Sequence, residues 1–179
     1  MITLIMGKSG SGKSAYAEEY TAQLSQKNRK YYLATMEVFD EEGRIRAERH
    51  RKQRRGKGFV TIEQPVDIYR VMDKIENVRM ETALLECISN LTANEMFHGE
   101  TMLPGPLAAD KVVNEVEKLG LSLRHLVIVS NSAFEAGTEY DEATMEYIQT
   151  VADINERLAD LADQVIEVVE GIPNVIKER

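Results

Sequence analysis

The sequence has no tryptophan, four prolines and a single cysteine, Cys87, among its 179 residues. One cysteine excludes an intramolecular disulfide and any metal site built from several cysteines. No apolar run approaches the roughly 18 residues that a membrane-spanning helix needs, and the N-terminus lacks the pattern of a secretory signal peptide. These absences predict a cytoplasmic protein, and the length predicts one domain over residues 1–179.

Negative charge is in excess, but positive charge is concentrated in one segment. The formal net charge is −8 at pH 7. Residues 44–57 (RIRAERHRKQRRGK) hold eight arginines and lysines and one glutamate, so this segment carries +7 and the rest of the chain −15. A basic segment in an acidic protein indicates a local anionic ligand. The overall charge and the lack of aromatic residues within the segment argue against nucleic acid as a partner.

Short apolar runs alternate with helical patterns along the chain. The runs predict strands at 2–6, 31–35, 59–62, 82–88, 126–130 and 165–169, and the tail 172–176 can add an edge strand. Helical patterns cover 13–25, 41–54, 89–97, 107–119 and 141–161, with one more helix carrying Val66, Tyr69, Ile75 and Val78. This alternation is typical of an α/β fold with three layers, a mostly parallel sheet of about six to seven strands between helices.

The segment from Gly7 to Ser14, GKSGSGKS, has the form G-x-x-x-x-G-K-[ST]. This motif indicates phosphate binding only between a strand and a helix, and the predicted 2–6 strand and 13–25 helix meet that condition. Its backbone N–H groups and the helix N-terminus attract phosphate oxygens. Lys13 is expected to reach the β and γ phosphates, and the Ser14 hydroxyl to bind Mg²⁺. The sequence therefore predicts a P-loop NTPase-type fold, rather than a Gly/Ser-rich turn with an accidental lysine.

P-loop proteins also need an acidic residue at the end of a hydrophobic strand, where it holds the water shell of the metal. Glu86, within the sequence LLEC of residues 84–87, is the candidate. Glutamate stands here in place of the usual aspartate. The alternative is a strand-end glutamate that faces solvent.

In the predicted 41–54 helix, Glu42, Arg46, His50 and Arg54 recur at steps of four and form one stripe. Arginine neighbours disfavour the charged form of a histidine, and a neutral imidazole can act as a base or as a nucleophile toward phosphorus. The alternative is a solvated basic face on which His50 is one more polar residue, and spacing alone favours that alternative. No two histidines have the spacing of a zinc site.

Longer motifs extend the pattern along most of the chain. Residues 40–54 have the form D-x-E-x-x-x-R-x-x-x-H-x-x-x-R, from Asp40 through His50 to Arg54, and residues 61–65 have the form T-x-E-x-P. With the Gly-rich loop and LLEC, these motifs resemble the bifunctional adenosylcobinamide kinase/adenosylcobinamide-phosphate guanylyltransferase family of cobalamin synthesis. The resemblance runs nearly end to end, and its most specific part is the pattern around His50.

The resemblance implies two reactions. A kinase step phosphorylates the aminopropanol hydroxyl of adenosylcobinamide. A second step moves GMP from GTP onto that phosphate with release of pyrophosphate, through a covalent phosphoramidate on His50. The implied ligands are GTP, or ATP in the kinase step, with Mg²⁺ and a corrinoid, and the implied assembly is a homo-oligomer, with a trimer favoured.

The resemblance also implies a set of site residues. Catalytic roles fall to His50 and Lys13, and metal binding to Ser14 and Glu86. The implied nucleotide contacts are Gly7, Lys8, Ser9, Gly10, Ser11, Gly12, Lys13, Ser14, Ala34, Thr35, Met36, Arg51, Lys52, Gln53, Arg54, Glu63 and Glu86.

Two parts of the chain depart from the family pattern. Gly10 stands where the family loop has arginine, and residues 131–139 (NSAFEAGTE) replace N-E-V-G-x-G-I-V-P. Residues 145–149 (MEYIQ) replace R-x-F-R-D. These departures leave two alternatives open. One is a divergent P-loop kinase or guanylyltransferase with another acceptor, and the other is a nucleotide-sensing protein that has lost one or both activities.

Overall fold

The structure, a computed structural model, describes residues 1–38, 41–132 and 140–179. Within the helix at 41–54 it leaves out the side chains of Glu42, Arg46, Ala47, Arg49, His50 and Gln53. The described strands are β1 (Ile2–Gly7), β2 (Lys30–Ala34), β3 (Phe59–Glu63), β4 (Thr82–Glu86), β5 (His125–Asn131), β6 (Gln164–Val169) and β7 (Ile172–Glu178). The described helices are α1 (Lys13–Ser25), α2 (Glu41–Arg54), α3 (Ile88–Phe97), α4 (Gly105–Ser122) and α5 (Glu142–Leu161), with short 3-10 helices η1 (Ile68–Lys74) and η2 (Val78–Met80).

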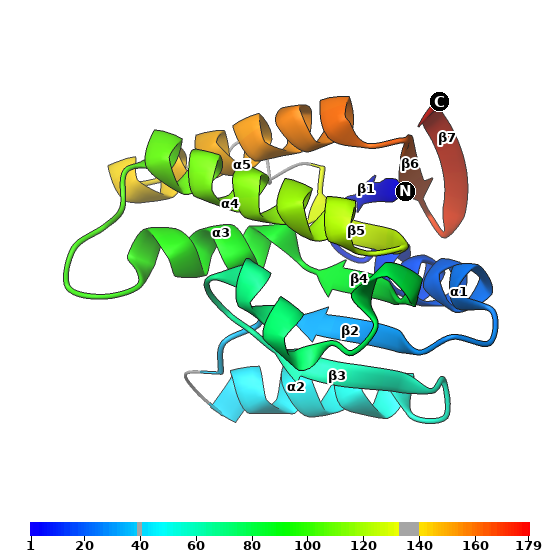
Figure 1. The fold of residues 1–179 in the computed structure, drawn as a ribbon. Helices are drawn as coiled ribbons and strands as arrows, with labels where there is room; N and C mark the ends of the chain where they lie inside the picture. Colours follow the sequence, from blue (N-terminus) through cyan, green and yellow to red (C-terminus); the bar gives the residue numbers. More distant parts are fainter. Residues whose placement is uncertain (39–40, 133–139) are drawn as a thin grey trace.

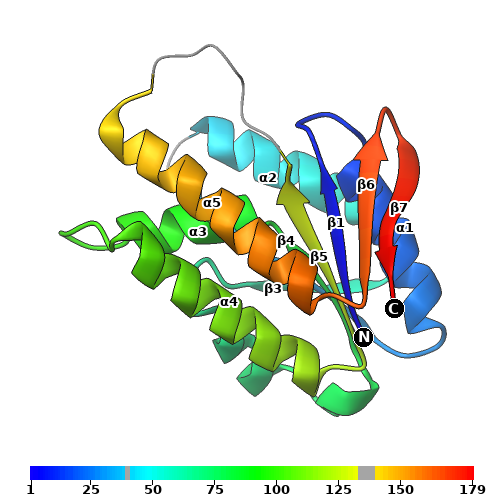
Figure 2. The same ribbon diagram turned by 90° about the horizontal axis from the view of Figure 1, so that it is seen from above.

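Among the described residues, the strands form one seven-stranded sheet in the order β3-β2-β4-β5-β1-β6-β7. All neighbouring pairs are parallel except β6 and β7, which are antiparallel. Helix α1 lies on one face of the sheet, and α3, α4 and α5 lie on the other (Figures 1 and 2). The expected α/β fold with three layers and a β7 edge strand is confirmed.

Burial explains why the central strands read as continuous apolar runs. Leu4, Leu85 and Ile128 pack into the larger core cluster beneath α3, α4 and α5, whereas Ile5 and Leu84 pack into a smaller one beneath α1. All five side chains are fully buried. When helices cover both faces of a sheet, the side chains that point to either face are buried. Such a strand is therefore apolar along its whole length and does not alternate between apolar and polar residues.

The predicted helix over Val66 to Val78 is wrong, because this segment forms the two 3-10 helices η1 and η2. Asp67 and Asn77, which precede them, adopt φ values of 50° and 52°. A left-handed residue interrupts α-helical hydrogen bonding, although the apolar spacing around it is helix-like. Ile88 was expected to end a strand and instead begins α3, because the pairing of β4 with β5 ends at Glu86.

The strand register brings the predicted site to one edge of the sheet. Ala34, the last residue of β2, pairs with Glu63 at the end of β3 and with Glu86 at the end of β4. Gly7 ends β1 at the same edge, since β1 and β4 both run parallel to β5. Ligands of open parallel sheets bind outside the carboxyl ends of the strands, which is this edge.

Both ends of the chain contribute to one sheet, because β1 pairs with β6 through Leu4 and Val165. This pairing supports a single domain over residues 1–179, which stays a prediction. No helix within the described ranges is both long and apolar enough to cross a membrane.

Candidate nucleotide site

The Gly-rich loop between β1 and α1 has the backbone that its glycines permit. Gly10 and Gly12 adopt φ values of 75° and 87°, in the left-handed region that favours glycine. A Cβ on Gly7 would lie 2.6 Å from the carbonyl oxygen of Val168, so β6 approaches too closely for a side chain there. Residues 8–11 also line a cavity of about 310 Å³ with residues 167–170. A loop with this backbone, followed directly by a helix, is suited to bind phosphate oxygens through its N–H groups.

Lys13, the first residue of α1, is largely buried at 8% exposure. Its Nζ donates a hydrogen bond to the carbonyl oxygen of Lys8, at 3.1 Å, within the same loop. Burial lowers the pKa of Lys13 from 10.5, and the nearby Cys87 and Glu86 oppose that shift. The amine thus lies inside the loop, bound to a neutral oxygen that phosphate oxygens can replace.

Ser14 and Glu86 meet although 72 residues separate them in the sequence. The Ser14 hydroxyl donates to Oε1 of Glu86 at 2.5 Å. A hydroxyl beside a carboxylate is a donor set that suits Mg²⁺, which prefers oxygen ligands and usually binds through few protein groups plus substrate phosphates. The two predicted metal ligands therefore fit that ion, and the contact disfavours a solvent-facing glutamate at position 86.

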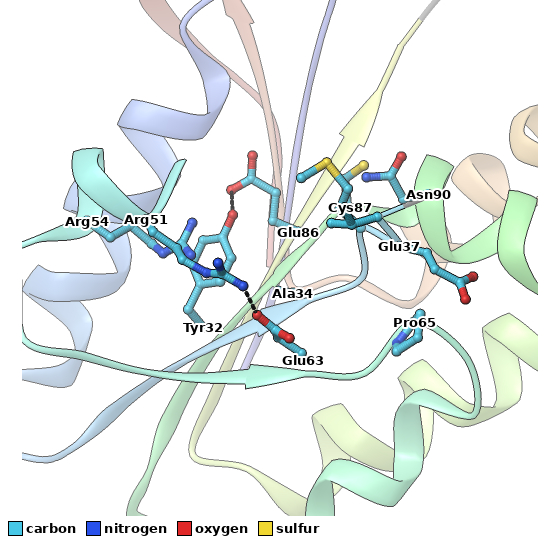
Figure 3. Close-up of a pocket in the computed structure, with 12 residues that line it drawn as sticks. Tyr32, Ala34, Glu37, Arg51, Arg54, Glu63, Pro65, Glu86, Cys87 and Asn90 are labelled. Carbon is cyan, nitrogen blue, oxygen red and sulfur yellow. Dashed lines mark hydrogen bonds and ion pairs between the residues drawn. The ribbon is translucent and has the colours of Figure 1, made fainter. Parts of the chain in front are cut away.

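A cavity of about 310 Å³ lies between α2 and the ends of β2, β3 and β4 (Figure 3). Six residues of the predicted site line it: Ala34, Met36, Arg51, Arg54, Glu63 and Glu86. The guanidinium of Arg51 forms an ion pair with Glu63 across the opening. The lining combines two arginines with three carboxylates, those of Glu37, Glu63 and Glu86, so the cavity suits a polar ligand that bears phosphate and is bound together with a cation.

Arg54, at the end of α2, is only 7% exposed and lies over the ring of Tyr32, with Cζ 3.6 Å from the ring centroid. Its Nε and Nη1 are buried and have no hydrogen-bond partner among the described residues. Unpaired buried donors of a charged group are costly unless a ligand supplies acceptors. Among the α2 arginines whose side chains are described, Arg54 is therefore the best prepared to bind an anion.

Other predicted residues lie differently. Lys52 is exposed on α2 and does not line the cavity. Thr35 is fully buried, and its hydroxyl donates to the Cys87 carbonyl oxygen and accepts from the Cys87 N–H. His50 and Gln53 belong to α2, but their side chains lie outside the described residues. Their predicted roles, like those of the other site residues, stay predictions.

The sequence interpretation missed Tyr32 and Asn90, which also line the cavity. Tyr32 precedes Ala34 by two residues in β2, so strand alternation places both on one face and is a signal that can identify it. Asn90 carries no comparable signal, because only the turn from β4 into α3 directs it toward α2.

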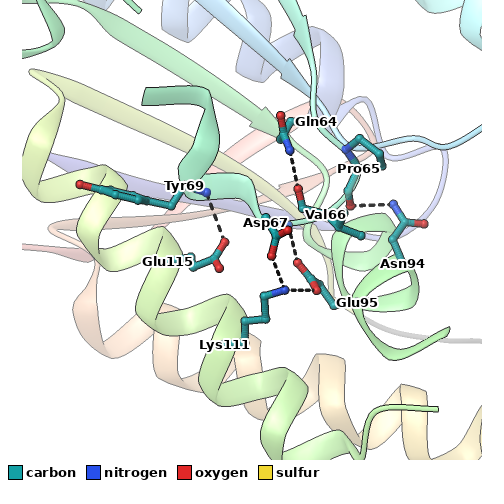
Figure 4. A network of polar contacts seen from close by, with 9 residues as sticks. All are labelled: Gln64, Pro65, Val66, Asp67, Tyr69, Asn94, Glu95, Lys111 and Glu115. Carbon is teal, nitrogen blue, oxygen red and sulfur yellow. Dashed lines mark hydrogen bonds and ion pairs between the residues drawn. The ribbon is translucent and has the colours of Figure 1, made fainter. Parts of the chain in front are cut away.

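A second group of polar residues holds the rim of the cavity (Figure 4). Nδ2 of Asn94 donates to the carbonyl oxygens of Thr35 and Pro65, at 2.7 and 2.9 Å. The adjacent Glu95 accepts from the N–H of Asp67 and from Lys111. Helix α3 thereby fixes the segments that follow β2 and β3.

Cys87 follows Glu86 and lines the same cavity. Burial raises the pKa of its thiol to about 11. A thiol that stays protonated at neutral pH is a poor nucleophile, so nothing here favours Cys87 as one.

Comparisons with known proteins identify the family of the chain. The family model for "Cobinamide kinase / cobinamide phosphate guanyltransferase" matches residues 3–176. The "Bifunctional adenosylcobalamin biosynthesis protein CobU" of Escherichia coli (strain K12) is 27% identical over 189 residues, covering 99% of this chain and all of the relative.

Two solved structures resemble the fold. One is an ATPase domain, with a TM-score of 0.50 at 12% identity, covering 93% of this chain and 68% of that one. The other is the flagellar accessory protein FlaH from Methanocaldococcus jannaschii, with a TM-score of 0.46 at 14% identity, covering 99% and 78%. The ATPase domain supports the P-loop type of α/β fold. From the family match over nearly the whole sequence, the chain belongs to the cobinamide kinase / cobinamide phosphate guanyltransferase family.

Proposed function

We propose that the protein acts in cobalamin biosynthesis, where it phosphorylates adenosylcobinamide and then transfers GMP from GTP to the product. The observation that carries the proposal is the meeting of Ser14 with Glu86 beside a cavity that contains Arg51 and Arg54. Family membership and the relative from Escherichia coli support the choice of a corrinoid acceptor. The proposal retains a cytoplasmic location and a homo-oligomer, with the trimer favoured by the resemblance.

In the kinase step, the loop of residues 7–14 binds the phosphates of GTP or ATP through its N–H groups. Lys13 exchanges its bond to the Lys8 carbonyl for one to a phosphate oxygen. Mg²⁺, when bound by Ser14 and Glu86, neutralises charge that develops between the β and γ phosphates. The acceptor hydroxyl gains the γ-phosphoryl group and loses its proton, and the nucleoside diphosphate leaves.

In the transfer step, neutral His50 attacks the α-phosphorus of GTP, a nitrogen–phosphorus bond forms, and the bond to the leaving pyrophosphate breaks. The phosphate oxygen of adenosylcobinamide phosphate then attacks the same phosphorus and releases the imidazole. Arg54 lies one helical turn after His50 in the sequence, and its N–H groups that lack a partner among the described residues can bind the negative charge on the phosphoryl oxygens.

Intact mass measurement tests the transfer step. After incubation with Mg²⁺ and α-labelled GTP, we expect an acid-labile adduct of one GMP on the wild-type protein and none on His50→Ala. His98→Ala removes an exposed histidine outside α2 and serves as the matched control, which should keep the adduct. Loss of the adduct in the control, or its persistence in His50→Ala, would contradict the role of His50. GTP binding without any adduct would limit the protein to phosphoryl transfer or nucleotide sensing.

A guanylyltransferase or kinase with another acceptor is the second candidate. The observation that favours it is the start of α5, where Met145 is 40% exposed and Glu146 accepts a hydrogen bond from the N–H of Gly105 at 2.7 Å. The family pattern has arginine at position 145, so this helix start lacks a cation present in relatives. Adduct formation on His50 without transfer to adenosylcobinamide phosphate would favour this candidate.

A further inference from the structure

Tyr32 contacts both halves of the candidate site and has no role in the mechanism above. Its hydroxyl donates to Oε2 of Glu86 at 2.9 Å, while the other carboxylate oxygen accepts from Ser14. The guanidinium of Arg54 lies on its ring (Figure 3). Tyr32 itself is only 4% exposed, so its position is set by the packing of β2. One buried side chain thus touches the candidate metal ligand and the candidate phosphate ligand.

The hydroxyl determines how Glu86 is oriented. A carboxylate at a strand end can rotate, and a second donor on its far oxygen fixes the near oxygen toward Ser14. A tyrosine hydroxyl is a hydrogen-bond donor, and here it donates to the carboxylate oxygen that does not face Ser14. When Ser14 turns to a metal ion, Tyr32 continues to hold the carboxylate.

The ring determines how Arg54 is oriented. Stacking covers one face of the guanidinium and is favourable for an arginine that has lost most of its water. Within the described ranges Nε and Nη1 are buried without a hydrogen-bond partner, and the residue lines the cavity. Without the ring, a buried arginine next to a cavity can adopt several rotamers, and few of them direct its N–H groups at a ligand.

We propose that Tyr32 is a positioning residue that aligns the metal end and the phosphate end of the nucleotide site at once. Its hydroxyl holds Glu86 toward Ser14, and its ring holds Arg54 toward the phosphates. The inference rests on the proposed function, because it requires a Mg²⁺–nucleotide ligand in this cavity.

Two substitutions separate the two contacts. Tyr32→Phe removes the hydroxyl and keeps the ring, whereas Tyr32→Leu removes both. GTP binding is measured by calorimetry across a Mg²⁺ titration and again in EDTA. For Tyr32→Phe we expect the Mg²⁺ concentration at half saturation to rise about 10-fold, as when a residue that hydrogen-bonds to a metal ligand is replaced. The affinity for GTP in EDTA should change little. For Tyr32→Leu we expect GTP affinity in EDTA to fall roughly 3- to 10-fold as well.

Tyr31→Phe is the matched control, because Tyr31 is equally buried but packs on the opposite face of β2. It should bind GTP like the wild type in both conditions. An unchanged Mg²⁺ requirement in Tyr32→Phe would overturn the inference. The proposed function would still be supported in that case if the wild type binds GTP. Wild-type protein that binds no GTP would refute both. Should the leucine variant fail to fold, the Mg²⁺ requirement of Tyr32→Phe decides alone.

Discussion

At the scale of the residue, the buried charge of Lys13 contributes little to the stability of the nucleotide-free protein. The amine is largely buried and bonds to the neutral carbonyl of Lys8, so its environment favours the uncharged form. A lysine whose folded pKa lies below its unfolded value costs stability at every pH below the folded pKa. That cost decreases as the pH rises through the interval up to 10.5, because the folded amine is then already neutral.

Lys13→Met is therefore expected to stabilise the nucleotide-free protein and to weaken GTP binding roughly 10- to 100-fold, the usual loss for hydrogen bonds to a charged group. Urea unfolding between pH 7 and pH 10.5 should show the stability difference from wild type decreasing as the pH rises. Lys27→Met removes an exposed lysine after α1 and controls for the change in net charge. A less stable Lys13→Met at pH 7 would contradict this explanation.

At the scale of the element, a partly buried ion cluster of Asp67, Glu95 and Lys111 joins the start of η1 to α3 and α4 (Figure 4). Nζ of Lys111 lies 2.6 Å from carboxylate oxygens of both Asp67 and Glu95, and the Glu95 side chain is 5% exposed. Burial lowers the pKa of Lys111, but the hydrogen bonds that it donates to Asp67 and Glu95 outweigh burial and leave the pKa above 10.5. While the two carboxylates are ionised, the lysine contributes stability that is fully present from neutral pH up to 10.5 and is lost as the pH rises through its folded pKa.

Lys111→Met leaves Glu95 charged and buried without its cation, so we expect a loss of about 3 kcal/mol in the free energy of unfolding. Denaturation in urea at pH 7 measures it. Lys118→Met, an exposed lysine on the same helix, should change stability little. Adding Glu95→Gln to Lys111→Met should recover part of the loss, because the buried charge is removed. Equal effects of the two lysine substitutions would show that the ion cluster is not what stabilises this junction.

At the scale of the whole molecule, stability is expected to decrease from the centre of the sheet to the β7 edge. Leu126 to Ser130 of β5 are buried, and β5 has strands on both sides. In β7, Ile172 and Ile176 are 64% and 61% exposed, and the strand has a neighbour on one side only. Local opening of β7 therefore exposes little new apolar surface.

Hydrogen exchange should show this difference. We expect amides of β5 to exchange only through global unfolding and those of β7 to exchange on the order of 100-fold faster. Mass spectrometry of peptides from the two strands measures both within one sample. Equal protection of β5 and β7 would contradict the expectation and would indicate that another surface covers β7 in solution.

Local signals account for the parts of the fold that the sequence predicts well. The start of α1 at Lys13 follows from the glycines before it, and α2 has the predicted limits of 41 and 54. The prediction of a helix over residues 66–78 is wrong because Asp67 and Asn77 have a left-handed backbone. The spacing of apolar residues does not reveal such a backbone. Motifs identified those site residues that lie together in one contiguous stretch of the sequence, such as GKSGSGKS.

By itself, then, the sequence determined the P-loop, the order of strands and helices, and the family. Each of these can be recognised from residues that are adjacent in the chain. Only the tertiary structure decided that Glu86 lies against Ser14 and that Tyr32 contacts both Glu86 and Arg54. It also decided that Arg54 is buried, with two nitrogens that find no partner in the described part of the chain. These contacts depend on which strands become neighbours and in what register. Pairing of Ala34 with both Glu63 and Glu86 is a long-range outcome of sheet packing, which no local pattern records.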